Sequence, residues 1–371
     1  MKTTVTTTTE RLAAIDVLRG FDMFFLVGAG DVLRRFFGAF HSDSVNGILY
    51  QLDHVEWTGF TAWDIIMPLF LFTSGLSMPF SFSKFLKREG STKAGLYLKI
   101  MKRFLLLFLL GWIAQGRLLD LSLDTFHVYC NTLHAIAFGY LITALVILNL
   151  HSFKAQLGAG VALLLAYWAC LTFIPVPGFG AGVFTPDGNV AIHIDHALFG
   201  RFDDGTQYTW MLTSLAFGAT VISGYFAGRL LKTSLSPERK LTWLSLTGVA
   251  LIAGGLLWGL QMPVIKKIWS PSMVLLSSGI CYLLLALSFL LTDKLRLNGW
   301  WVTGLRIFGL NSIVAYMLHT TFKLDRVAGA LLHGFEQYTG DFYPFVVALG
   351  EFGILWFIIR HMYRHGIFIK I

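Results

Sequence analysis

Charged residues are scarce in this chain. Lys, Arg, Asp and Glu make up 13% of its 371 residues, whereas about a quarter of the residues in a soluble protein are charged. Hydrophobic residues make up 55%, and the mean hydropathy is +0.66. This composition argues against a soluble globular protein and predicts a polytopic membrane protein.

Familiar catalytic and cofactor motifs are absent as well. The sequence has no Walker loop, dinucleotide fingerprint, zinc motif or nucleophile elbow. Its three cysteines, Cys130, Cys170 and Cys281, are far apart and lack the spacing of metal ligands. We therefore expect no metal site, and the cysteines say little about the redox compartment.

Two further absences concern targeting and partners. The first ten residues, MKTTVTTTTE, lack the apolar stretch and small-residue cleavage site of a signal peptide, so we expect none to be cleaved. The net charge of +8 could suggest nucleic acid. In a membrane protein, however, the positions of the charges say more than their sum, and we expect no nucleic-acid partner.

Long apolar runs are what the chain does contain. A run of about 20 apolar residues can cross the hydrocarbon core as a helix, and unpaired backbone groups are not tolerated in lipid, which favours helices over strands. We predict an all-α transmembrane bundle of about ten helices in a lipid bilayer. The predicted spans are 17–37, 60–82, 104–118, 131–150, 156–176, 210–230, 241–260, 272–292, 300–319 and 344–360.

Basic residues gather in alternate loops. The segment from Lys84 to Arg103 holds seven Lys and Arg, whereas the loop around Asp120 and Asp124 is acidic. The positive-inside rule makes the first cytoplasmic and the second not, which puts both termini in the cytoplasm and the loop with His54 outside. Only QMPVIKK, in a loop predicted to lie outside, runs against the rule. We expect one transmembrane domain over residues 1–371, with a long extracytoplasmic loop at about 175–209.

Two ionisable residues stand out at the second predicted helix. His54 lies at its mouth, where a histidine could act as base, acid or nucleophile, or simply hydrogen-bond a loop. Asp64 follows ten residues later, inside the helix. A carboxylate at that depth is costly, so it should face a cavity or a partner; a structural ion pair is the alternative.

The first and third predicted helices carry charges near the cytoplasmic side. Asp16 and Arg19 are three residues apart and can form a local salt bridge. Asp22 is deeper and could line a polar passage. Arg103, at the start of the third helix, could reach lipid headgroups or hold a phosphate.

Late in the chain, polar residues interrupt an apolar helix. Asn311 and His319 are eight residues apart, about two turns, which predicts that they share one stripe facing the bundle interior. Hydrogen bonding between helices would explain both without any function. Glu351 in the last helix is open to the same two interpretations.

Several blocks together resemble the heparan-alpha-glucosaminide N-acetyltransferase family of multi-pass membrane enzymes, closest to its bacterial members linked with N-acetylglucosamine use. Its D-x-x-R-G, H-x-x-W-x-G and N-S-I patterns occur in the same order here, from about Arg11 to the C-terminus. The blocks are RLAAIDVLRGFDMFFLV, HVEWTGFTAWDIIMPLFLFTSGLSM, PVPGFGAGVFTPDGN, HIDHALFG and FGLNSIVAYMLH.

The resemblance implies an activity and a set of site residues. Members transfer acetyl from cytosolic acetyl-CoA to the amino group of a terminal glucosamine across the membrane, which implies an amino-sugar or glycosaminoglycan-fragment acceptor. The bacterial likeness implies an inner-membrane location, and we include a homodimer among the expectations. The implied catalytic residue is His54. The residues implied for acetyl-CoA are Arg19, Arg103, Asn311 and His319, and those implied for the acceptor are Asp64, Trp57 and Asp195.

The chain also departs from the family pattern. His134 and Ala135 stand where many relatives have a polar residue and an arginine, and Gly30 stands where some have an asparagine. Direct transfer with His54 as base is our preferred mechanism, with an acetyl-imidazole intermediate as the alternative. A transporter of amino sugars or small muropeptides, using Asp22, Asp64 and Glu351, is the alternative function. A purely structural scaffold would not need buried carboxylates.

Overall fold

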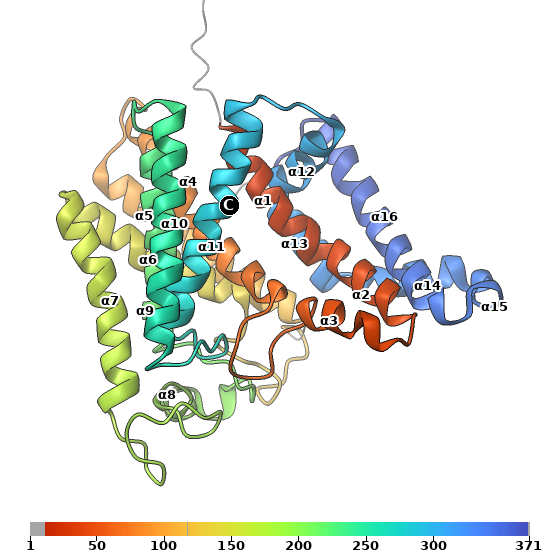
Figure 1. The fold of residues 1–371 in the computed structure, drawn as a ribbon, viewed down its shortest axis with the longest axis horizontal. Helices are drawn as coiled ribbons and strands as arrows, with labels where there is room; N and C mark the ends of the chain where they lie inside the picture. Colours follow the sequence, from red (N-terminus) through yellow and green to blue (C-terminus); the bar gives the residue numbers. More distant parts are fainter. Residues whose placement is uncertain (1–11, 117, 370–371) are drawn as a thin grey trace, which may run out of the picture.

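Helices provide the regular structure in residues 12–116 and 118–369, the part of the chain that the computed structural model describes (Figure 1). Within these residues there is no β-strand beyond isolated bridges, which confirms the all-α prediction. The threonine-rich segment 1–10 and Arg117 lie outside the described residues. The α-helices are α1 (Ala13–Phe24), α2 (Gly30–Gly38), α3 (Asp43–Gln51), α4 (Ile66–Leu86), α5 (Lys93–Gln115), α6 (Thr132–Asn149), α7 (Phe153–Phe173), α8 (Val190–Phe199), α9 (Ser214–Leu231), α10 (Pro237–Gly259), α11 (Pro271–Phe289), α12 (Trp300–Leu310), α13 (Ser312–Thr321), α14 (Leu324–Leu332), α15 (Glu336–Thr339) and α16 (Tyr343–Arg364).

Seven helical segments in the described residues are long and apolar enough to cross a membrane, or eight if the bent pair α12 and α13 counts as one span. The chain is therefore an integral membrane protein. Two of the ten predicted spans do not meet the same criterion. The first is broken into the short helices α1 and α2, and α5 has Lys99, Lys102 and Arg103 in its first half. The number ten stays a prediction.

The main bundle is held by close helix pairs. α10 packs along α11, α4 along α9, and α1 along α12. Glycines bring α4 and α9 together: a Cβ on Gly75 would lie 1.9 Å from the Val221 carbonyl oxygen, and one on Gly224 would lie 2.0 Å from that of Phe72. Small residues allow such backbone contact between membrane helices. This contact fixes the position of α4, whose first turns carry the candidate site.

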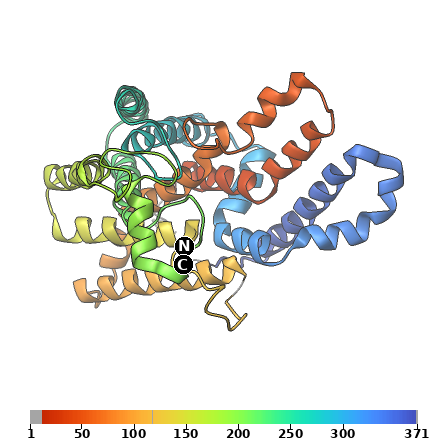
Figure 2. The same ribbon diagram turned by 90° about the horizontal axis from the view of Figure 1, so that it is seen from below.

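Away from the main bundle, α2 and α3 form one projecting arm and α14 to α16 form another (Figure 2). α2 packs against α16 where the arms meet. The predicted helix 17–37 is interrupted here by a π-helical segment, η1 (Phe25–Ala29), with a kink at Gly28. A Cβ on Gly28 would lie 2.2 Å from the ring of Phe352, so the small residue lets α16 approach the kink.

The prediction of one continuous helix over 300–319 is wrong. α12 and α13 meet at an angle of 72°, with Asn311 between them. The Asn311 amide donates to the Ile367 carbonyl at 3.1 Å and accepts from the Ile369 N–H at 3.2 Å. Because Asn311 occupies the bend and binds the C-terminal tail, it does not share a single helical stripe with His319.

Loops that are predicted to share a side of the membrane meet at the same end of the molecule. Several hydrogen bonds join segments 52–61, 175–213 and 260–270. They include Gly59 N–H to the Val264 carbonyl at 2.9 Å, the Trp57 indole to the Phe184 carbonyl at 2.7 Å, and Thr209 N–H to the Lys267 carbonyl at 3.1 Å. This end is the lower one in Figure 1, near α8. We call it the loop end. These three loops thus lie together, as the predicted alternation of cytoplasmic and extracytoplasmic loops requires. Which side of the membrane each end faces stays a prediction.

Candidate active site

A capping box fixes Asp64 at the start of the α4 segment. Thr61 precedes the short 3₁₀ helix η2 (Ala62–Ile65), the Thr61 N–H donates to Asp64 Oδ2 at 3.1 Å, and the Thr61 side chain accepts from the Asp64 backbone N–H. Such reciprocal capping follows from the T-x-x-D spacing. Since one carboxylate oxygen is held by the cap, the other, Oδ1, is turned toward His54, whose Nδ1 lies 2.8 Å away.

The His54 and Asp64 side chains form an acid–base pair of unequal exposure. The Asp64 carboxylate is fully buried, while 40% of the His54 side chain is accessible. A buried carboxylate that accepts from Nδ1 orients an imidazole and leaves Nε2 free to take a proton. Asp64 therefore faces the histidine that the resemblance implies to be catalytic; it lines neither cavity, and its implied part in acceptor binding stays a prediction.

Lys266 joins this pair from the loop between α10 and α11. Its ammonium lies 3.2 Å from Asp64 Oδ1 and 2.9 Å from His54 Nδ1. Only 7% of the Lys266 side chain is exposed. Burial lowers the pKa of Lys266 to about 8, although the Asp64 carboxylate opposes that shift. We call His54, Asp64 and Lys266 the charged triad.

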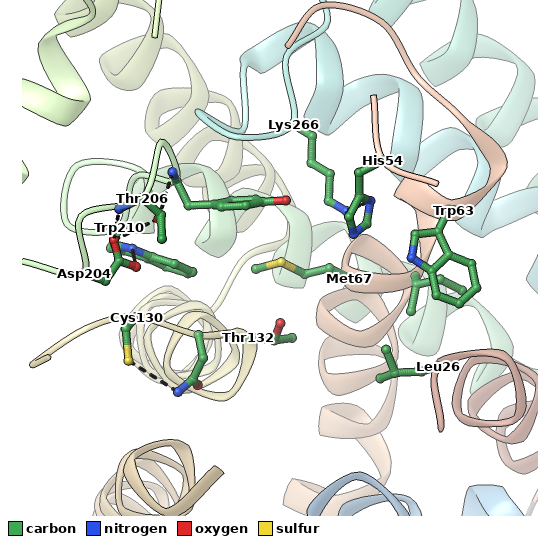
Figure 3. A pocket seen from close by; sticks show the side chains of 13 residues that line it. Leu26, His54, Trp63, Met67, Cys130, Thr132, Asp204, Thr206, Trp210 and Lys266 are labelled. Atoms are coloured by element: carbon green, nitrogen blue, oxygen red, sulfur yellow. Dashed lines mark hydrogen bonds between the residues drawn. The ribbon is translucent and has the colours of Figure 1, made fainter. Parts of the chain in front are cut away.

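The triad borders a cavity of about 280 Å³ at the loop end. Figure 3 shows His54, Lys266 and Trp63 on one wall and Asp204, Thr206 and Trp210 across from them. A second cavity of about 250 Å³ adjoins it and reaches Tyr316 on α13. Both cavities are lined by Cys130, Asn131, Asp204 and Thr206. His54 lines the first cavity and not the second.

Asp204 places a carboxylate on the wall opposite the triad. Its Oδ1 accepts from the N–H and hydroxyl of Thr206 at 2.9 and 2.8 Å, and its Oδ2 accepts from the Trp210 indole at 2.9 Å. Burial raises the pKa of Asp204, with the Thr206 and Trp210 hydrogen bonds opposing the shift. The carboxylate borders both cavities and can contact a ligand in either one.

Asp195, which the resemblance implies for acceptor binding, lines neither cavity, and that role stays a prediction. It is fully buried in α8 and accepts two backbone N–H groups, from Trp210 at 2.6 Å and from Met211 at 3.0 Å. Burial raises the pKa of Asp195 to about 6, against the effect of these two bonds. The start of α8 is capped by Asn189, which accepts from Ile192 N–H at 2.9 Å. Asp195 instead secures the turn that leads into α9.

The residues predicted to contact acetyl-CoA do not line either cavity. Arg19 donates to the Ser77 hydroxyl, and the Arg103 guanidinium lies over the Tyr140 ring at 4.2 Å. His319 lies 3.2 Å from Glu351 Oε1, which joins α13 to α16. Their part in cofactor binding, like that of Asn311, stays a prediction.

Two curated proteins resemble this chain over most of its length, while no protein-family model matches it. The human heparan-alpha-glucosaminide N-acetyltransferase is 26% identical over 84% of this chain and 53% of its own length. The mouse protein of the same name is 24% identical over 85% of this chain and 54% of its own. The chain is a distant relative of the heparan-alpha-glucosaminide N-acetyltransferases. It spans about half the length of the curated relatives it matches.

The departures from the N-acetyltransferase pattern have local structural explanations. His134 is fully buried, accepts from the Cys130 N–H at 3.2 Å and lies 3.0 Å from the Phe108 carbonyl through Nε2. It therefore holds the turn that brings Cys130 into the cavity. At Gly30, a Cβ would lie 2.0 Å from the Trp63 indole, so the cavity wall made by Trp63 requires glycine there.

Sequence reasoning within the N-acetyltransferase resemblance missed Lys266 and Asp204. Lys266 did give a signal, because QMPVIKK was the one basic segment placed against the positive-inside rule. A lysine that pairs with a buried aspartate need not follow a rule about solvated loops. Asp204 gave no such signal, since it is one of several aspartates in a polar loop.

Among the described residues, no group of three or more His, Cys, Asp or Glu side chains is arranged to hold a metal. Trp57 ties the loop of His54 to Phe184 and lines neither cavity.

Proposed function

We propose that this protein is a transmembrane N-acetyltransferase that moves acetyl from acetyl-CoA to the amino group of a glucosamine-type sugar. The observation that carries the proposal is the pairing of His54 with the buried Asp64 at the edge of a cavity of about 280 Å³. The relationship to proteins named as N-acetyltransferases supports the reaction class.

The chemistry follows from the orientation of the imidazole. In the tautomer with Nδ1–H donated to Asp64, the Lys266 ammonium donates to Asp64 rather than to Nδ1. His54 Nε2 then removes a proton as the sugar amine attacks the thioester carbonyl. The new C–N bond forms, the C–S bond breaks, and the proton held by His54 passes to the departing CoA thiolate. In the alternative, Nε2 attacks the thioester carbonyl, the C–S bond breaks and the CoA thiolate leaves, which gives an acetyl-imidazole. The amine then attacks the acetyl carbon, and the bond from that carbon to Nε2 breaks. Trapping of radiolabelled acetyl on His54 in the absence of acceptor would support the second route over the first.

Asp204 is the proposed contact for the acceptor amine. A primary amine is cationic before it loses a proton, and Asp204 is the carboxylate that lines both cavities, with Thr206 and Asn131 beside it as partners for hydroxyl groups. This assignment replaces Asp195, which lines neither cavity.

The two substrates are proposed to approach from opposite ends. Acetyl-CoA would come from the cytoplasmic side, where Arg19, Arg103 and the basic segment 84–103 can meet its phosphates. The sugar would enter at the loop end, which is extracytoplasmic in this proposal. A bacterial inner membrane fits this arrangement, and a homodimer remains an expectation.

Acetyl transfer by the purified protein tests the proposal. The detergent-solubilised chain is mixed with acetyl-CoA and glucosamine, and released CoA thiol and N-acetylglucosamine are measured. We expect turnover that falls about 10²–10⁴-fold in His54→Ala, while His333→Ala, at an exposed histidine on the far arm, behaves as wild type. Acetyl-CoA binding should survive in both variants. Transport of the sugar without acetyl-CoA binding would overturn the proposal in favour of a transporter.

A further inference from the structure

Lys266 is the part of the charged triad that the proposed reaction does not use. It comes from a loop 212 residues away in the chain from His54, yet its ammonium lies 2.9 Å from Nδ1 and 3.5 Å from Nε2. A lysine whose side chain is 7% exposed is expensive to keep charged, and a surface role cannot account for it.

The three side chains carry an uneven set of charges. Asp64 supplies one negative charge, and the Lys266 ammonium already offsets it at 3.2 Å. A protonated His54 would add a second positive charge beside the first, with only one carboxylate between them. Without Lys266, Asp64 would face His54 alone, and an opposite charge at 2.8 Å favours the imidazolium form.

We propose that Lys266 is a positioning residue that keeps His54 in its neutral, proton-accepting form. The ammonium neutralises Asp64, so the carboxylate can orient the imidazole through Nδ1 without also drawing a proton onto Nε2. The benefit to acetyl transfer depends on the proposed function above, because a protonated imidazole cannot take the proton of the attacking amine.

Other titratable groups approach His54 from each neighbouring element, and none of them offsets Asp64. Asp53 accepts the His54 backbone N–H at 2.8 Å. The Arg34 guanidinium on α2 lies 5.3 Å from the ring centre of Trp63, which is itself 6.5 Å from the ring centre of His54. Burial raises the pKa values of Tyr208 and Cys130 to about 12, which leaves both neutral near pH 7. Asp204 is on the opposite wall, bonded to Thr206 and Trp210.

The loop geometry holds Lys266 in place independently of its charge. The Ile265 N–H donates to the Ser270 hydroxyl at 3.0 Å, and the Trp269 N–H donates to the Lys266 carbonyl at 2.9 Å. Trp269, fully buried, anchors the loop in the bundle and donates from its indole to the Thr220 hydroxyl at 3.0 Å. Replacement of the Lys266 side chain should therefore leave the loop folded.

Chemical labelling reads the charge of His54 directly. Diethyl pyrocarbonate modifies neutral imidazole and not imidazolium, so the pH at which labelling of the His54 peptide is half-maximal reports its protonation. The full-length protein in detergent is labelled between pH 5 and pH 9, and the modified peptides are quantified by mass spectrometry. His41, whose side chain is 71% exposed on the projecting arm, is the internal control in each sample.

The expected result is a midpoint for His54 that rises by about one pH unit or more in Lys266→Met and stays close to wild type in Lys266→Arg. Asp204→Asn, which removes a charge from the opposite wall, should move the midpoint much less than Lys266→Met. In acetyl transfer from acetyl-CoA to glucosamine, the acidic limb of kcat/KM should move in the same direction as the labelling midpoint. An unchanged or lower midpoint in Lys266→Met, or the same rise in Lys266→Arg, would overturn the proposal.

A second comparison keeps the inference testable if Lys266→Met does not fold. The double variant D64N/K266M must then show a higher midpoint than D64N alone, because only the single variant retains the unpaired cation. Equal midpoints in these two proteins would reject the role of Lys266. Absence of acetyl transfer in the wild-type protein would reject the proposed function while the labelling result still decides the charge of His54.

Discussion

Asp64 and Asp195 are both fully buried aspartates near the loop end, but their partners differ in kind. Asp195 is bonded to two backbone N–H groups, whereas Asp64 shares its oxygens between a capping threonine and two ionisable side chains. Backbone donors are what a helix start or turn requires. Titratable donors beside a cavity allow the carboxylate to control proton transfer. Burial alone therefore does not distinguish the two aspartates, whereas the chemistry of their partners does.

Substitution of Asp64 should have the largest effect of any aspartate on acetyl transfer. Asp64→Asn retains an oxygen for the Thr61 cap but removes the charge that orients His54, so we expect kcat to fall by about 10²–10⁴-fold. Steady-state kinetics with acetyl-CoA and glucosamine measures this. Activity within a few fold of wild type would mean that the carboxylate serves only the cap.

Asp204→Asn should affect acceptor binding and leave acetyl-CoA binding alone. Loss of one charge-assisted contact, about 1.5–3 kcal/mol, corresponds to a KM for glucosamine that is raised by roughly tenfold or more. The hydrogen bonds to Thr206 and Trp210 can partly be kept by the amide. An unchanged KM for all amino sugars tested would remove Asp204 from the acceptor site.

Asp195→Asn should change stability and not kinetics. The amide can accept from only one of the Trp210 and Met211 N–H groups, and its NH₂ would face the other, which we expect to destabilise the fold by about 1–3 kcal/mol. Thermal unfolding in detergent gives the loss, and the KM values for both substrates should stay normal. A raised glucosamine KM would return Asp195 to the acceptor site.

The loss of stability in Asp195→Asn should also depend on pH, and this is the smallest of the expected effects. The pKa of Asp195 is about 6 in the folded chain against 3.8 for an ordinary aspartate, because of burial. Between these values the folded state binds more protons than the unfolded state, so this residue's contribution to stability falls as pH rises. Asp195→Asn should therefore lower the Tm more at pH 5 than at pH 7. A greater loss at pH 7 would show that the folded state favours the carboxylate.

The comparison also shows how far sequence reasoning reached. His54 and Asp64 could each be singled out from the sequence, because one lies at the mouth of an apolar helix and the other inside it, but their pairing was not predicted. Lys266 could not, since it reaches the same carboxylate across 212 residues of chain from His54 and depends on how two loops pack. The all-α fold followed from composition and apolar runs. The bend at Asn311 did not, because it comes from a contact with the C-terminal tail that helical periodicity does not report.

Three loops meet at the loop end, and their contacts should open on heating before the helices unfold. Part of the cavity wall belongs to segments 52–61, 203–213 and 260–270, which are joined by hydrogen bonds between loops, while the rest comes from the helical bundle, including Ile66 and Met67 of α4. Such regions open with less free energy than packed helices do. Heating should therefore separate the triad from Asp204 while the transmembrane helices remain intact, so inactivation would precede the loss of helical circular dichroism and would be reversed on cooling.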